Sequence, residues 1–257
     1  MRFPLALSAR LSAQKISRTF GGKRAPLIFH FSPLVSHLPP DTRLDSVFPE
    51  TAWHTPEAGV QAANLAQAPA VWLGGVEPLL HPGIGKVTTA LEQSGRYVFL
   101  ETGGADLRKR IHEFRPDPRF FFAFQISGDE VTGNPTAAER ALRTVSETVR
   151  MVRLSGFFAC AHLVVGAQTS VSEASRLFQA LAQSNIDGLL VSSGGGCSGA
   201  ASTAILNEKL REVRNAIPSR RWRKFSSLLD DSYPRAAPVK EPSHLQAREA
   251  GTCGESA

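Results

Sequence analysis

Several apolar runs of this chain are followed by glycines and a single carboxylate, and these residues could bind a ligand. In the clearest case, the apolar run 70–74 leads into Gly74, Gly75 and Glu77. Glycine lets a backbone approach a ligand closely, and a carboxylate accepts hydrogen bonds from an ammonium group. The stretch Trp72–Pro82 therefore predicts a strand-to-helix turn that presents bare backbone and one negative charge at the edge of a sheet.

Small polar runs also follow four later apolar segments, namely Glu101–Gly104, Ser127–Asp129, Gly166–Gln168 and Ser192–Gly196. In α/β barrels the residues that follow the strands meet at one face, where the site lies. Turn residues are common in any such loop, so one run alone says little. The ordered series favours a rim that binds a nucleoside, with Thr102, Ser127 and Asp129 as candidate residues beside Glu77.

The elements that would position these residues are six apolar runs, which alternate with helical patterns as in βαβ units. Their continuous hydrophobicity is typical of parallel strands covered on both faces. The runs are 27–31, 70–74, 97–101, 120–126, 157–165 and 188–192. Six units within about 190 residues predict an α/β fold with a partial (β/α)6 TIM-like barrel, since a full barrel typically needs ~250. An open doubly wound sheet is the alternative.

Two helix starts are marked in the sequence. Asn134 before Pro135 combines a capping residue with a proline at the first helical position, and predicts a helix to about Ser155. The run Ser170–Glu173 matches a capping box.

The chain divides into three segments. We expect a basic N-terminal helix over 1–24, one domain over 25–230 and a disordered tail over 231–257. The first segment holds six Lys and Arg residues and no acid, which fits a solvated leading helix, with a transit peptide or a surface-binding helix as alternatives. The last is polar and interrupted by prolines.

The ordered motifs resemble those of the radical S-adenosylmethionine (SAM) superfamily, from about Met1 to Asp230. The stretch Gly74–His81 resembles the family's GGEP-type motif for the SAM amino group. Thr102–Gly104 is similar to the Thr-Asn-Gly after the third strand, and Ser127–Asp129 resembles the Ser-x-Asp element linked to the SAM ribose and carboxylate. The resemblance implies SAM binding by Gly74, Gly75, Glu77, Thr102, Ser127 and Asp129.

The chain departs from that family where the iron–sulfur cluster would be held. The family places Cys-x3-Cys-x2-Cys after the first strand, but 32–44 contains no cysteine, and His37, Asp41 and Leu44 occupy those positions. Thiolates are the usual cluster ligands, and leucine cannot ligate iron. We therefore expect no [4Fe–4S] cluster and no radical chemistry. Val76 is a second departure, because it separates the glycines from Glu77.

These observations predict a non-catalytic protein that binds SAM or another ligand, or that partners an active enzyme. One alternative is an enzyme that uses SAM or another nucleotide by non-radical chemistry. Another is a radical SAM enzyme whose cluster ligands come from elsewhere, although Cys160, Cys197 and Cys253 are dispersed.

The remaining features narrow the class of protein. The dispersed cysteines favour a reducing cytoplasm, and no apolar run approaches the ~18 residues that span a bilayer. Nucleic-acid binding is not expected, because the basic cluster 220–224 contains a single aromatic residue. The run Gly194–Gly199 matches the Gly-x-Gly-x-x-Gly motif of dinucleotide-binding folds. A helical pattern rather than a strand follows it, so we do not expect a dinucleotide site. His30 and His162 lie within strands, and we interpret them as core residues rather than members of a catalytic triad.

Overall fold

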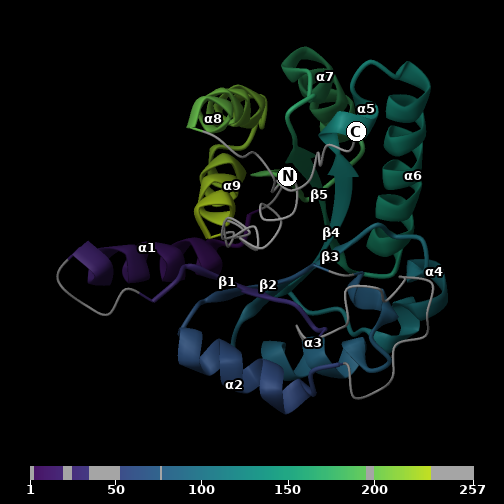
Figure 1. The fold of residues 1–257 in the computed structure, drawn as a ribbon. Coiled ribbons are helices and arrows are strands. Elements are labelled where there is room, and N and C mark those ends of the chain that lie inside the picture. The colour runs from purple at the N-terminus through teal and green to yellow at the C-terminus, as the bar shows by residue number, and fades with distance from the viewer. Residues whose placement is uncertain (1–2, 20–24, 35–52, 76, 195–199, 233–257) are drawn as a thin grey trace, which may run out of the picture.

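In the computed structural model, residues 3–19, 25–34, 53–75, 77–194 and 200–232 are described. They form one parallel sheet of six strands in the order β1-β2-β3-β4-β5-β6, curled into a half-barrel (Figure 1). The strands are β1 (Ile28–Phe31), β2 (Ala70–Leu73), β3 (Tyr97–Thr102), β4 (Phe120–Ser127), β5 (Phe158–Val165) and β6 (Gly188–Ser193). The predicted α/β partial barrel is confirmed, and each predicted strand is present to within one residue at either end.

Helices surround this sheet on both of its faces. They are α1 (Leu5–Thr19), α2 (Pro56–Ala66), α3 (Ile84–Gln93), α4 (Leu107–Arg110), α5 (Gly128–Val131), α6 (Pro135–Leu154), α7 (Val171–Ala182), α8 (Ala200–Asn215) and α9 (Arg220–Ser232). Helices α2, α3 and α6 pack on the outer face (Figure 1). Helix α9 contacts both edge strands, β1 and β6, and so spans the open side of the half-barrel.

An aromatic layer fills the base of the inner face. The parallel register sets Trp72 opposite Phe99, Phe99 opposite Phe121, and Phe121 opposite Phe158. Their rings stack with centroids 5.8, 4.9 and 5.1 Å apart. Trp222 of α9 meets the Phe99 ring edge-on at 6.4 Å. Because this layer is close-packed, it leaves no room for a ligand at the base of the inner face.

Both predicted helix starts are present, but one is built differently from the prediction. The side chain of Asn134 accepts a hydrogen bond from the Ala137 N–H at 3.0 Å. Ser170 likewise caps α7 by accepting from the Glu173 N–H at 3.4 Å. The Glu173 carboxylate does not complete a capping box, because it accepts from the Gly133 N–H at 2.9 Å and ties α7 to the turn before α6.

A helix lies near each end of the described part of the chain. Helix α1 lies within the predicted leader 1–24. Helix α9 continues to Ser232, and the rest of the predicted tail, 233–257, lies outside the described residues. Over the ranges that the structure describes, every helix is too short or too polar to cross a membrane.

A buried acid on α3 gives the stability of this fold a pH dependence. Burial raises the pKa of Glu92 to about 7, with repulsion from Asp117 adding to the shift and Arg119 opposing it. The folded state therefore holds a proton that the unfolded chain releases above its ordinary pKa of 4.5. Stability from this group is complete below pH 4.5 and is lost as the pH rises to about 7.

We predict that Glu92→Gln removes this loss. In urea denaturation, the variant should match the parent chain near pH 4.5 and exceed its unfolding free energy by about 2 kcal/mol at pH 8. Both proteins keep every other titrating group, so those contributions cancel in the difference. A difference that does not change with pH would contradict a protonated Glu92 in the fold.

Candidate functional site

The turn after β2 requires glycine at both of its predicted positions. Gly74 is buried, and a Cβ atom there would overlap the Glu101 carboxylate and crowd the Trp72 indole. Gly75 is exposed and has φ of +96°, a conformation that residues with a side chain rarely adopt. The two glycines thus bring backbone over Glu101 and then out to the surface, while Val76 lies outside the described residues.

The Glu77 carboxylate joins two neighbouring turns. Its Oε1 accepts from the Leu79 N–H at 3.1 Å and caps the 3₁₀ turn Pro78–Leu80. Its Oε2 accepts from the Gly103 N–H at 2.9 Å, in the turn after β3. A carboxylate has about four acceptor sites, so this half-buried group retains capacity for a ligand. The prediction that Glu77 faces a ligand is compatible with this geometry and stays a prediction.

The two predicted hydroxyl groups shape their own turns. Thr102 is buried, and its Oγ1 accepts from the Gly104 N–H at 2.9 Å. The Ser127 Oγ accepts from the Glu130 N–H at 3.3 Å and caps α5. Both hydroxyls can still donate one hydrogen bond, and their assignment to ligand binding is not tested by these contacts.

Asp129 links the turns after β4 and β5. Its Oδ1 accepts from the Thr169 hydroxyl at 2.7 Å, and that hydroxyl accepts from the Gly166 N–H at 2.9 Å. Asp129 itself is exposed. The structure therefore places the six predicted residues along one edge of the sheet in two groups. Gly74, Gly75, Glu77 and Thr102 lie at β2 and β3, and Ser127 and Asp129 lie at β4.

A buried hydrogen-bonded chain, not predicted from the sequence, lies beneath this edge. The Trp72 Nε1 donates to Glu101 Oε2 at 3.1 Å, and His162 Nδ1 lies 2.7 Å from Glu101 Oε1. On its other side, His162 Nε2 lies 2.8 Å from the Ser192 Oγ. His162 and Ser192 are fully buried, and Glu101 is nearly so. We call these four residues the buried polar chain.

The strand register explains how residues so distant in sequence meet. Glu101 lies opposite Ala123, and Ala123 lies opposite Cys160. Because both neighbours are small, the Glu101 and His162 side chains meet across β4 with no bulky group between them. Glu101, His162 and Ser192 are each a polar residue at one inner-facing position of a largely apolar strand, and this is the signal that the sequence offered.

The order Ser192–His162–Glu101 is that of a hydrolase relay, a grouping that the sequence did not reveal. Because these three residues are buried, their hydrogen bonds stabilise the core and do not serve a catalytic reaction. With its proton on Nδ1, the His162 ring donates to the Glu101 carboxylate and accepts from the Ser192 hydroxyl, which satisfies all three groups. A substrate cannot reach Ser192 at zero exposure. The interpretation of His162 as a hydrogen-bonded core residue is confirmed.

A second histidine adds no positive charge to this region at neutral pH. Burial lowers the pKa of His30 to about 4, while the negative Glu101 opposes the shift. Its ring centroid lies 6.4 Å from that of Trp72. His30 therefore adds no positive charge at the base of the site, beside the Glu101 carboxylate.

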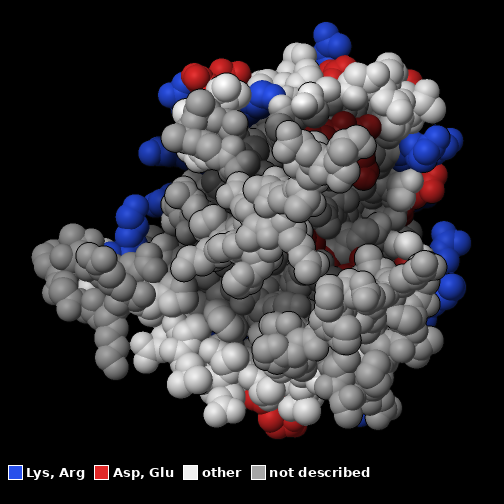
Figure 2. Space-filling model, viewed as in Figure 1, with Lys and Arg blue, Asp and Glu red and all other residues white. Residues whose placement is uncertain are grey.

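The surface above the buried polar chain is a hollow with acidic groups in it. Figure 2 shows Asp and Glu atoms set back in the recess of this face, with Lys and Arg at its outer margin. Glu77, Glu101 and Asp129 lie at or just after the carboxyl ends of β2, β3 and β4, and we call the space above these strand ends the strand-end hollow. Gln125 is exposed although it lies on the inner face of β4. Such a site favours a ligand with positive charge.

The described residues offer no iron–sulfur site. Cys160 lies inside β5, and burial raises the pKa of its thiol well above the usual value, so it stays protonated. No group of three or more His, Cys, Asp or Glu side chains in the described ranges is arranged to hold a metal ion. His37, Asp41, Leu44, Cys197 and Cys253 lie outside those ranges.

Comparisons with known proteins give a likeness of fold. No protein-family model matches the chain, and no curated protein matches its sequence. Among solved structures, Streptococcus suis SuiB matches with a TM-score of 0.50 and 14% identity, both alone and bound to its precursor peptide SuiA. The match covers 79% of this chain and 48% of SuiB. The fold is therefore similar to that of a radical SAM enzyme.

Two further structures are more distant. SuiB bound to S-adenosylmethionine gives a TM-score of 0.48 at 13% identity over 81% of this chain and 50% of that one. A truncated 3-deoxy-D-arabino-heptulosonate 7-phosphate synthase from Thermotoga maritima gives 0.40 at 13% identity, over 73% and 61%. The chain spans about half the length of SuiB.

We predict that the buried polar chain contributes strongly to stability. His162→Phe keeps an aromatic ring but leaves Glu101 buried without this donor, and should lower the unfolding free energy by about 3 kcal/mol. Ser192→Ala removes one neutral hydrogen bond and should cost about 1 kcal/mol. Urea denaturation of each variant measures both.

A double-mutant cycle supplies the control. In a His162→Phe background, Glu101→Gln should cost less than it does alone, because the charge it removes has already lost a donor. Strictly additive effects of the two substitutions would contradict a coupled pair.

Proposed function

We propose that this chain binds a small cationic nucleoside, with SAM as the leading candidate, in the strand-end hollow and does not cleave it. The observation that carries the proposal is the Glu77 carboxylate, which joins the turns after β2 and β3 and retains acceptor sites. The motif resemblance at Gly74–His81 and the likeness of fold to SuiB, which has been solved with SAM bound, support the choice of ligand.

Four residues of the hollow would contact SAM in this proposal. SAM carries positive charge on its ammonium and sulfonium groups, which the acidic hollow attracts. Glu77 and the exposed Gly75 backbone would meet the ammonium end, and Asp129 would accept from ribose hydroxyls. Gln125, exposed on the inner face, offers both a donor and an acceptor for the base.

Radical chemistry is not part of the proposal. The loop after β1 supplies no cysteine, and the Cys160 thiol is buried and protonated. Without iron to chelate its amino and carboxylate groups, SAM would bind through the hollow alone and more weakly. We further propose a cytoplasmic protein whose partner performs any chemistry.

Calorimetric titration of the purified protein with SAM tests this proposal. We expect a dissociation constant of roughly 10–100 μM, that is about −5.5 to −7 kcal/mol. Gln125→Phe should abolish binding because the larger side chain fills the hollow. The variant should still fold, since the Gln125 side chain is exposed and takes no part in the backbone hydrogen bonds of the sheet. Glu77→Gln should weaken binding by about tenfold or more through the lost charge.

Two controls make the result decisive. Glu130→Gln removes an exposed acid from the same edge outside the named groups and should leave the affinity within about twofold. Chromatography of SAM after incubation should return it intact. No heat at millimolar SAM would refute SAM binding, and a new nucleoside product would refute the non-catalytic assignment.

A further inference from the structure

A second candidate site carries the opposite charge to that of the strand-end hollow. Five cationic residues line a groove between α8 and α9, with a volume of about 510 Å³. They are Arg211, Arg214, Arg220, Arg223 and Lys224. The other lining residues, Asn215 and Ser227, are neutral and polar, so no carboxylate of the described residues lines the groove. We call this space the basic groove.

The position of these cations on α9 is unfavourable for the folded protein by itself. Arg220, Arg223 and Lys224, together with Arg221, lie in the first five residues of the helix, which has no acid in its first turn. The N-terminal end of a helix carries partial positive charge, so cations there are repelled. The four side chains also repel one another. An anion held in the basic groove would relieve both effects.

A backbone contact fixes the orientation of one guanidinium that lines the groove. Arg223 donates from Nη2 to the Ile217 carbonyl at 3.0 Å, which fixes its plane. Its Nε is buried and has no hydrogen-bond partner among the described residues. Arg211 pairs with Glu208 at 2.7 Å, but both side chains are more than 60% exposed, and such a pair is weak and open to exchange.

The lining of the groove selects the chemistry of the anion. Trp222 and Phe225 point from α9 into the core and are buried, so within the described part of the chain no aromatic side chain lines the groove to stack on the bases of a nucleic acid. Of the side chains that the structure describes, none that lines the groove is apolar and suited to insertion into lipid. Arginine forks match phosphate oxygens in pairs. A volume of about 510 Å³ is also in the usual range for small-molecule sites.

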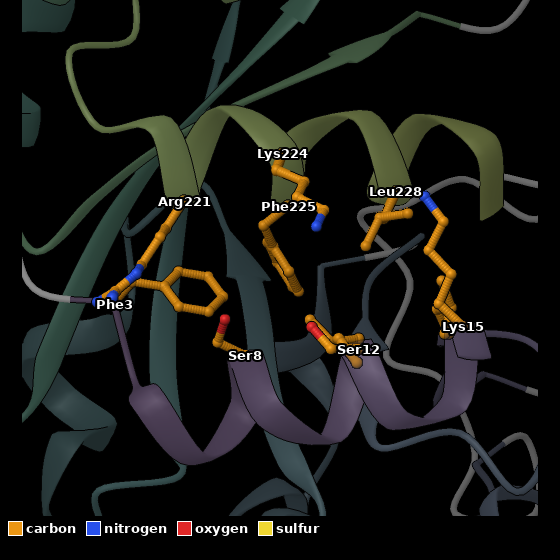
Figure 3. A pocket seen from close by; sticks show the side chains of 10 residues that line it. Phe3, Ser8, Ser12, Lys15, Arg221, Lys224, Phe225 and Leu228 are labelled. Atoms are coloured by element: carbon orange, nitrogen blue, oxygen red, sulfur yellow. The ribbon is translucent and has the colours of Figure 1, made fainter. Parts of the chain in front are cut away.

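The neighbouring cleft between α1 and α9 does not compete for this role. Figure 3 shows Lys15, Arg221 and Lys224 at its margin, around apolar side chains that include Phe225. Its volume is only about 40 Å³, which is enough for little more than water. Lys224 lines both spaces, so the basic surface continues from one to the other while the ligand-sized space lies in the basic groove.

We propose that the basic groove binds a small ligand bearing two or more phosphate groups. Arg214, Arg220, Arg223 and Lys224 supply the charges, and Asn215 and Ser227 supply neutral hydrogen bonds. The site is independent of the strand-end hollow and of SAM.

Calorimetric titration of the full chain with inorganic pyrophosphate at fixed ionic strength tests the proposal. We expect a dissociation constant of roughly 100 μM or tighter, weakening as salt is added. The double variant Arg220→Glu/Lys224→Glu should lose at least about tenfold in affinity. Without ligand, the same variant should melt no lower than the parent, because glutamate suits the start of a helix, so misfolding cannot imitate the loss.

The matched control is Arg140→Glu/Arg143→Glu on α6, which makes the same change in net charge at exposed positions. It should keep the pyrophosphate affinity within about twofold. An equal loss in both variants, or no binding by the parent chain, would overturn the proposal. So would binding of only phosphatidylserine vesicles or a single-stranded oligonucleotide, each run as a separate titration, because these would assign the surface to a membrane or a nucleic acid.

Discussion

The buried carboxylate of Glu101 is the constraint on which the rest of the structure depends. An ionised group in a protein interior is tolerated only when donors surround it, and Trp72 and His162 provide them from β2 and β5. Those contacts need Ala123 to be small and Gly74 to lack a side chain. Strand register, glycine placement and the position of the inner aromatic layer are therefore linked to one charge.

The molecule has two regions of opposite charge. Above the buried polar chain, carboxylates converge on the strand-end hollow, and His30, a second described histidine near Glu101, is kept neutral by burial. On α8 and α9, cations converge on the basic groove. Helix α9 connects the regions physically, since its inner side carries Trp222 into the aromatic layer while its outer side carries the cations. A nucleoside-sized cation suits the first region and a phosphate-bearing anion suits the second.

The sequence was sufficient for the elements but not for their side-chain contacts. Continuous apolar runs predicted six parallel strands, and Asn134 and Ser170 marked two helix starts, because these signals are local. The bond from Gly103 to Glu77 depends on how two turns approach each other, and Glu101 meets His162 across 61 positions. Such contacts follow from strand register, which hydrophobic pattern alone does not specify. Trp222, surrounded by arginine and lysine in the sequence, likewise gave no sign of its place in the core.

Nitrogen-15 NMR of the histidine rings is the measurement that tests the buried polar chain most directly. At neutral pH, His162 should show a single tautomer with its proton on Nδ1, and that proton should exchange slowly with solvent because the ring is fully buried. In Glu101→Gln the same proton should move upfield and exchange faster. A ring proton on Nε2, or a His162 signal unaffected by Glu101→Gln, would contradict the account.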